Sequence, residues 1–172
     1  LKTTDDELIG ILKEENVVTM TDWNDEKKGT FSVPGENYGD LYKCSYGVGE
    51  GSSNGADLTS ESIRGKRIGV GNLSGSYIPT YERKTHDDID YDDTLLIKFI
   101  VAINNSSATY DSMSAVVDME YLAIQQAVGY IVGNPDDMRY NYNNYMIYLR
   151  RTDGKAIFIP IDNDRCFGIT KD

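Results

Sequence analysis

The sequence contains few of the residues that build the commonest metal and nucleophile sites. Only two cysteines, Cys44 and Cys166, occur among its 172 residues, and their spacing fits no zinc motif. Two cysteines are too few for a disulfide framework, and the sequence leaves open whether they form one long-range bridge or stay two free thiols. Histidine occurs once, as His86, which argues against chemistry that needs a histidine pair or a serine–histidine couple.

Long apolar runs and a positive charge balance are also lacking. No run is long enough to span a bilayer, so we expect no membrane span. Lys and Arg number 17 against 28 Asp and Glu, which gives a formal net charge of −11. Such a surface repels nucleic acid and suits a metal cation or a basic peptide, although solubility alone also accounts for it. The chain opens at Leu1 without an initiator methionine or signal peptide, so we expect a processed or excised piece.

Its size and composition, with 40% hydrophobic and 26% charged residues, predict one folded domain or one lobe of a larger one. Two central helices are expected. The first follows the acidic run "DDIDYDD" of residues 87–93, where apolar residues recur at helical spacing up to Ile103. The second should cover residues 112–132, lie buried because it is apolar on more than one side, and end at Gly133 and Pro135.

The first half of the chain predicts short strands and loops. A capping-box spacing between Thr4 and Glu7 indicates a short helix that ends near residue 15. The stretches "GDLYKC" and "SYIPTYERK" are strand candidates on either side of a glycine-rich region. Gly69, Gly71 and Gly75 miss the spacing of a phosphate-binding loop by one residue, so turns explain these glycines better.

A β-hairpin is expected near the C-terminus. Residues 145–149 and 156–161 are apolar runs, and Asp153-Gly154 between them is a strong hairpin signal. Asp162 and Asp164 then stand at the exit of the second strand. Together with the two helices and the short strands, this hairpin predicts an α+β fold.

The order of these parts matches a protein kinase catalytic lobe, in which a helix, a catalytic loop, a hairpin and a metal-binding aspartate follow one another. There, one loop aspartate accepts the proton of the attacking hydroxyl, and an asparagine and the later aspartate hold magnesium on the ATP phosphates. The loop here contains Asp136 and Asp137, and Asn141 lies at the kinase spacing after Asp136, although no His-Arg pair precedes it.

Residues 133–168, "GNPDDMRYNYNNYMIYLRRTDGKAIFIPIDNDRCFG", resemble the core signature of the CotH kinase family, atypical protein kinases first known from spore coat proteins. "GDLYKC" and "YERKTHDD" resemble further segments of that family, whereas Ile161 stands where it usually has Trp. The resemblance implies a kinase-like catalytic lobe in residues 39–172. Residues 1–38 would be an N-terminal helix and loop segment of the same domain, or the whole chain would be a fragment that lacks part of the ATP site.

The resemblance also implies a function, which is ATP-dependent phosphorylation of Ser or Thr on extracellular, cell-surface or spore-coat proteins with Mg or Mn. By position it makes Asp136 the catalytic residue, with Asp137 as its competitor, and Asp162 the metal-binding residue. The remaining implied site residues are Asp164, Asn143 and Asn144 for the metal, and Lys43 and Lys84 for the phosphates.

Two alternatives stay open. Tyr140, Tyr142, Tyr145 and Tyr148 cluster around the proposed site, and aromatic clusters bind sugars or partner proteins. The chain would then be a surface module without activity. In a purely structural alternative, Asp162 and Asp164 bond turn amides and hold no ligand.

Overall fold

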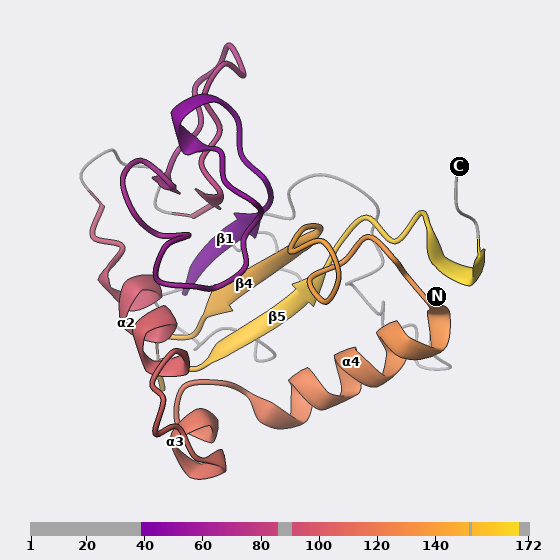
Figure 1. Ribbon diagram of the computed structural model, residues 1–172. Coiled ribbons are helices and arrows are strands. Elements are labelled where there is room, and N and C mark those ends of the chain that lie inside the picture. The colour runs from indigo at the N-terminus through magenta and orange to yellow at the C-terminus, as the bar shows by residue number, and fades with distance from the viewer. Residues whose placement is uncertain (1–38, 86–90, 152, 169–172) are drawn as a thin grey trace, which may run out of the picture.

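The computed structural model describes residues 39–85, 91–151 and 153–168, which form an α+β unit around one five-stranded sheet (Figure 1). In chain order the elements are β1 (Asp40–Cys44), η2 (Gly49–Gly51), β2 (Ile68–Gly69), β3 (Tyr81–Arg83), α2 (Thr94–Ile103), α3 (Tyr110–Ser114), α4 (Met119–Val132), β4 (Tyr145–Leu149), β5 (Ala156–Pro160) and η3 (Cys166–Gly168). The strand order is β2-β3-β1-β4-β5, and only the β2–β3 pair is parallel. The predicted fold class is confirmed.

The main core lies between the sheet and α2. Side chains of a strand alternate between the two faces, so Tyr145, Ile147 and Leu149 of β4 share the face that α2 covers. Phe99 of α2 meets Phe158 of β5 edge to face, with ring centroids 6.1 Å apart. Each such buried apolar side chain contributes roughly 1.5–3 kcal/mol, which is why the spacing of apolar residues in the sequence finds α2 correctly.

The start of α2 is attached to the sheet by a nearly buried ion pair. Arg83 Nη2 lies 2.6 Å from Asp93 Oδ2, and the Tyr42 hydroxyl donates to Asp93 Oδ1 at 2.7 Å. Asp93 therefore bonds the sheet instead of capping the helix, and Asp92 accepts the Thr94 N–H in its place. Residues 87–90 of the predicted acidic run lie outside the described residues.

The prediction of one buried helix over residues 112–132 is wrong. The chain leaves the helical path at Val117, which forms a parallel bridge with Ala156, and α3 and α4 result. Asp118 then caps α4 by accepting the Tyr121 N–H at 3.2 Å. None of the residues of α4 is buried, and Val128 and Ile131 are 52% and 80% exposed. Apolar spacing shows that a helix has apolar faces, but not whether anything covers each one.

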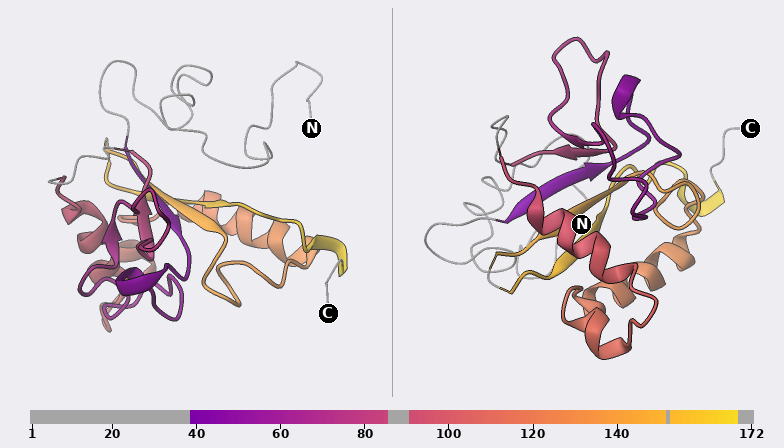
Figure 2. Two further views of the ribbon diagram at one scale, coloured as in Figure 1. Left: turned by 90° about the horizontal axis from the view of Figure 1, so that it is seen from above. Right: turned by 60° about the vertical axis from the view of Figure 1, so that its left-hand side comes forward.

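The C-terminal hairpin is confirmed. Strands β4 and β5 pair antiparallel from Leu149↔Ala156 to Tyr145↔Pro160, and Gly154 takes the left-handed conformation in the turn with φ 71°. Figure 2 shows from above that α4 runs on the β5 side of the sheet, whereas most of the long loops after β1 lie beside β1 and β3. The part near Ala56 reaches the loop after α4, because the Ala56 N–H donates to the Tyr142 carbonyl at 2.8 Å. The hairpin therefore brings the exit of β5 close to the loop that follows α4.

The glycine-rich region forms turns, as the sequence predicts. The Asn72 N–H donates to the Tyr77 carbonyl at 3.0 Å, and the Gly75 N–H donates back to the Asn72 carbonyl. "SYIPTYERK" forms a strand only over β3. The expected helix near Thr4 falls outside the described residues. Among the residues described, no helix is both long and apolar enough to cross a membrane.

Candidate functional site

The candidate site lies where the loop between α4 and β4 meets the segment that leaves β5 (Figure 1). Helix α4 ends at Gly133, whose φ of 65° is the left-handed conformation that ends helices. The loop returns to the sheet at Asn144, whose backbone carbonyl accepts the Ile161 N–H at 3.0 Å. This bond joins the end of the loop to the residue just before Asp162.

Asp136 is held from several directions. Its N–H donates to Asn134 Oδ1 at 3.0 Å, and its carbonyl accepts from Asn144 Nδ2 at 3.0 Å. Its carboxylate accepts from Asn141 Nδ2 at 2.8 Å, with Arg165 Nε 3.7 Å from the second oxygen. The side chain keeps 17% of its surface exposed. The Asp136 carboxylate is thus fixed in direction, with Asn141 bonded to one oxygen and Arg165 beside the other, and it keeps part of its surface accessible.

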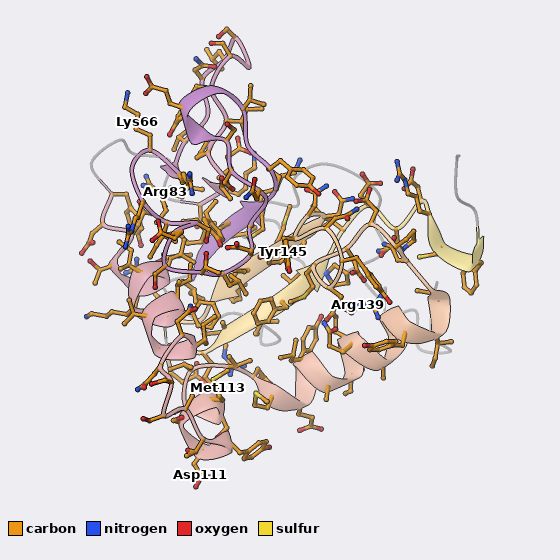
Figure 3. All side chains as sticks on the ribbon, in the orientation of Figure 1. Lys66, Arg83, Asp111, Met113, Arg139 and Tyr145 are labelled. Atoms are coloured by element: carbon orange, nitrogen blue, oxygen red, sulfur yellow. The ribbon has the colours of Figure 1, made fainter. Side chains whose placement is uncertain are left out.

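Asp137 has a different environment. Arg139 donates to one carboxylate oxygen of Asp137 through Nε at 2.8 Å and Nη2 at 2.5 Å, and its backbone N–H donates to the other. The guanidinium carbon of Arg139 lies 4.6 Å from the ring centre of Tyr130 and 5.5 Å from that of Tyr140. Figure 3 shows Arg139 between α4 and the loop. Asp137 therefore anchors the loop, and the geometry favours Asp136 over Asp137 as the catalytic group.

The exit of β5 carries the two other predicted carboxylates. Asp162 and Asp164 are exposed, and neither has a hydrogen bond or ion pair within the described part of the chain. The structural alternative, in which these carboxylates bond turn amides, finds no such bond among residues 39–85, 91–151 and 153–168. Between them, Asn163 Oδ1 accepts from Asn134 Nδ2 at 3.1 Å. The loop and the β5 exit thus meet through an asparagine pair.

Backbone strain is concentrated in this region. Among the described residues, five that are not glycine adopt a left-handed φ, and four of them surround the site: Tyr142, Asn144, Asp162 and Phe167, with φ of 54–58°. Left-handed backbone costs a residue with a side chain of order 1–3 kcal/mol and persists only where the surroundings enforce it. Such strain is typical of functional sites.

A comparison with protein-family models matches residues 21–172 to the family described as CotH kinase protein. The match covers most of the chain. The chain belongs to the CotH kinase family. No curated protein matches the chain in a separate search. Membership of this family points to a kinase-like function and is compatible with the α+β fold, and the resemblance seen in residues 133–168 is confirmed.

Within this CotH kinase-like chain, the donor set suits magnesium better than a metal that needs a protein cage. The described residues contain no cluster of three or more His, Cys, Asp or Glu that could hold an ion. Magnesium usually takes one or two carboxylates and completes its shell with waters and phosphates. Asp162 and Asp164, with an amide oxygen of Asn143 or Asn144, fit that requirement. Asn144 uses its Nδ2 on Asp136, which leaves its Oδ1 for another partner.

Of the two lysines predicted for phosphates, Lys43 lies in β1 and Lys84 directly follows β3. Lys84 Nζ is 2.7 Å from Glu82 Oε2, so this ammonium already has a carboxylate partner. Lys43 stands opposite Met146, the second residue of β4, in the β1–β4 register, and forms no ion pair with another described residue. Lys43 is the better of the two for an anionic ligand.

The residues that sequence reasoning missed are the polar partners. Asn134, Arg139, Asn163 and Arg165 bond or face the loop and the β5 exit that carry the predicted aspartates, but the sequence gives none of them a role. Asn141 stands out in the sequence only through its spacing from Asp136, and the structure shows it bonded to that carboxylate. Of these four residues, only Arg139 has a local signal for its partner, because it follows Asp137, which it bonds, by two residues.

The two cysteines are free and buried. Burial raises the pKa of the Cys166 thiol, and the charges of Asp137 and Asp164 raise it further. A neutral thiol next to the candidate metal residues is a poor metal ligand, because the thiolate is the form that binds. The site is therefore one of oxygen donors.

Proposed function

We propose that this chain transfers the γ-phosphoryl group of ATP to Ser or Thr hydroxyls of protein substrates, with Mg or Mn as the metal. The observation that carries the proposal is the immobilised carboxylate of Asp136 facing the strained exit of β5. The loop and the exit come from separate parts of the chain. Three hydrogen bonds hold Asp136 in place, whereas Asp162 and Asp164 make none within the described residues and can bind a ligand.

In this reaction Asp136 accepts the proton of the substrate hydroxyl. The hydroxyl oxygen forms its bond to the γ-phosphorus while the bond from phosphorus to the bridging oxygen of ADP breaks, and ADP leaves with those electrons. Asn141 keeps the Asp136 carboxylate directed toward the hydroxyl. A general base of this kind contributes about 10²- to 10⁴-fold to the rate.

On the other side of the site, Asp162 and Asp164 hold the metal with the help of Asn143 or Asn144, and Lys43 binds a phosphate. A divalent ion bound there with ATP would neutralise the charge that develops on the γ-phosphoryl oxygens. The carboxylates need little rearrangement to bind it, because both are exposed and have no bond within the described chain to give up.

The test combines a thermal-shift titration with a phosphotransfer assay. ATP with Mg or Mn should stabilise the protein by about 2.7 kcal/mol at a hundred times the dissociation constant, and Asp162→Asn should remove this gain. Asp136→Asn should keep the gain but lose about 10²-fold or more in transfer. Asp111→Asn, an exposed aspartate on α3, is the matched control and should behave as wild type (Figure 3). A wild-type protein that neither gains stability nor transfers phosphate would refute the proposal.

A second function, binding of carbohydrate or a partner protein without catalysis, has one observation in its favour. Tyr130 and Tyr140 are 71% and 60% exposed and stack on Arg139, which gives a rigid aromatic surface beside the site. The predicted tyrosine cluster is only partly available, however, because Tyr145 and Tyr148 are buried in the sheet. Sugar binding that survives Asp162→Asn and is lost in Tyr140→Ala would favour this second function.

The proposed location is outside the cell, on the cell surface or in the spore coat, as for the family. The excess of acidic residues is compatible with this location. Fractionation of the source organism with an antibody against the chain tests it, and recovery in the cytosolic fraction alone would contradict it.

A further inference from the structure

One side-chain hydrogen bond joins the two halves of the candidate site directly. Asn134 Nδ2 donates to Asn163 Oδ1 at 3.1 Å, although the two residues are 29 positions apart. Asn134 follows the end of α4 and is 1% exposed, whereas Asn163 is exposed at the exit of β5. Because the Asn134 amide is buried and Asn163 is exposed, the bond restrains Asn163 more than it restrains Asn134.

Asn134 is also the residue that holds the catalytic loop. Its Oδ1 accepts the Asp136 N–H at 3.0 Å, and its backbone carbonyl accepts from Arg139 Nη2 at 3.4 Å. The Asp136 bond fixes the orientation of the amide, because an oxygen has to face that N–H and the nitrogen has to face Asn163. Residue 163 must therefore present a hydrogen-bond acceptor.

Asn163 stands between the two carboxylates proposed for the metal. Asp162 has a left-handed φ of 54°, a conformation that a side-chain-bearing residue keeps only under restraint. The bond from Asn134 to Asn163 supplies a restraint from the neighbouring residue. Through this bond, the direction of Asp136 and the placement of Asp162 depend on the same buried amide.

We propose that Asn163 is a positioning residue, which acts through Asn134 to fix the metal-binding exit of β5 relative to Asp136. This role rests on the proposed function. Phosphoryl transfer depends on placement of the hydroxyl, the phosphorus and the metal in line, and a misplacement of about 1 Å costs about 10²-fold in rate. The restraint therefore affects turnover more than it affects substrate binding.

The test uses the full chain with Asn163→Ala, Asn163→Asp and Asn54→Ala as the control, an exposed asparagine with no side-chain bond within the described residues. Asn163→Ala loses the acceptor, so kcat should fall about 10- to 100-fold while KM for ATP changes less than about twofold at saturating magnesium. Asn163→Asp keeps the acceptor oxygen and should recover kcat to within about threefold of wild type. Asn54→Ala should leave kcat unchanged.

A second readout does not depend on activity. In the metal-free protein, the side-chain amide protons of Asn134 should be protected from hydrogen exchange in the wild type and in Asn163→Asp, and lose that protection in Asn163→Ala. Equal protection in all three proteins would show that the bond does not form in solution and would overturn the proposal.

The two failures are distinguishable. Absence of transfer by the wild-type chain overturns the proposed function, and the positioning role with it, whatever the exchange data show. Transfer by the wild type that survives Asn163→Ala, or that falls equally in Asn163→Ala and Asn163→Asp, overturns the positioning role alone.

Discussion

Replacement of Arg139 by alanine should lower the stability of this protein substantially, although Arg139 lies in a loop. Only 11% of the Arg139 side chain and 8% of the Asp137 side chain are exposed. Removal of one partner of a buried ion pair costs about 3–5 kcal/mol, because the other charge is left without its counter-ion. The Arg139 backbone N–H still bonds Asp137 in the variant, and water reaches the cavity, so the lower end of that range applies.

The contacts with the two tyrosine rings add a smaller amount. Each cation–π contact contributes about 0.5–1 kcal/mol at exposed sites, and Tyr130 and Tyr140 are largely exposed. In total we expect Arg139→Ala to lose about 4–5 kcal/mol of unfolding free energy. At about 2–4 °C per kcal/mol for a chain of this size, the melting temperature should fall by about 8–20 °C.

Urea denaturation of Arg139→Ala and Asp136→Asn, followed by circular dichroism, provides the measurement. Asp136→Asn keeps the oxygen that Asn141 contacts and lies nearer to solvent, so it should lose less than about 1 kcal/mol. A loss below about 0.5 kcal/mol in Arg139→Ala would refute the structural role given to this pair. Asp137→Asn that folds normally but abolishes transfer would instead make Asp137 the catalytic residue.

Three further predictions follow from burial. Burial raises the pKa of Tyr42 and Tyr81 above the ordinary value of about 10, so the stability that this gives is complete below pH 10 and is lost as pH rises further. Unfolding free energy should therefore fall by about 1.4 kcal/mol per pH unit for each tyrosine above pH 10, and a flat urea midpoint from pH 9 to 11.5 would contradict this. Val128→Lys on the exposed side of α4 should change stability by less than about 0.5 kcal/mol, whereas Leu96→Ala in the core should cost about 2–5 kcal/mol by the same denaturation assay. Cys44, buried and with its pKa raised by burial, should react with a thiol reagent only as fast as the protein unfolds, and immediate labelling of the native protein would be inconsistent with its position.

The sequence predicts the elements whose stability depends on local pattern. Helix α2 follows from its apolar spacing and the hairpin from Asp153-Gly154, because in both the signal and the structure involve the same neighbouring residues. The break at Val117 could not be predicted in this way. It exists because Val117 pairs with Ala156, a residue 39 positions away, and a bridge between distant residues leaves no trace in local spacing.

The residues of the candidate site also fall into those that the sequence predicts and those that it does not. Asp136 and Asp162 are visible in the sequence because the chemistry requires carboxylates at those points of the order helix, loop, hairpin. Of the asparagine partners, Asn141 is visible only through its spacing from Asp136. Asn134 and Asn163 are not visible, because asparagine in a loop most often bonds its own backbone, and nothing local distinguishes the exceptions. Asn134 combines a local bond with a distant one, since its oxygen accepts the nearby Asp136 N–H and its nitrogen donates to Asn163.

The two hydrogen bonds of the Asn134 side chain determine which substitutions the site tolerates. A buried amide with both ends bonded has no alternative orientation. Its oxygen bonds the backbone N–H of Asp136, which a side-chain substitution there does not remove, whereas loss of the acceptor at Asn163 leaves the buried amide nitrogen without its partner and costs about 1–3 kcal/mol. The aspartates themselves are under less constraint from folding, because Asp162 and Asp164 are exposed. Substitutions at the aspartates should therefore affect ligand binding and transfer, and substitutions at Asn134 should also affect stability.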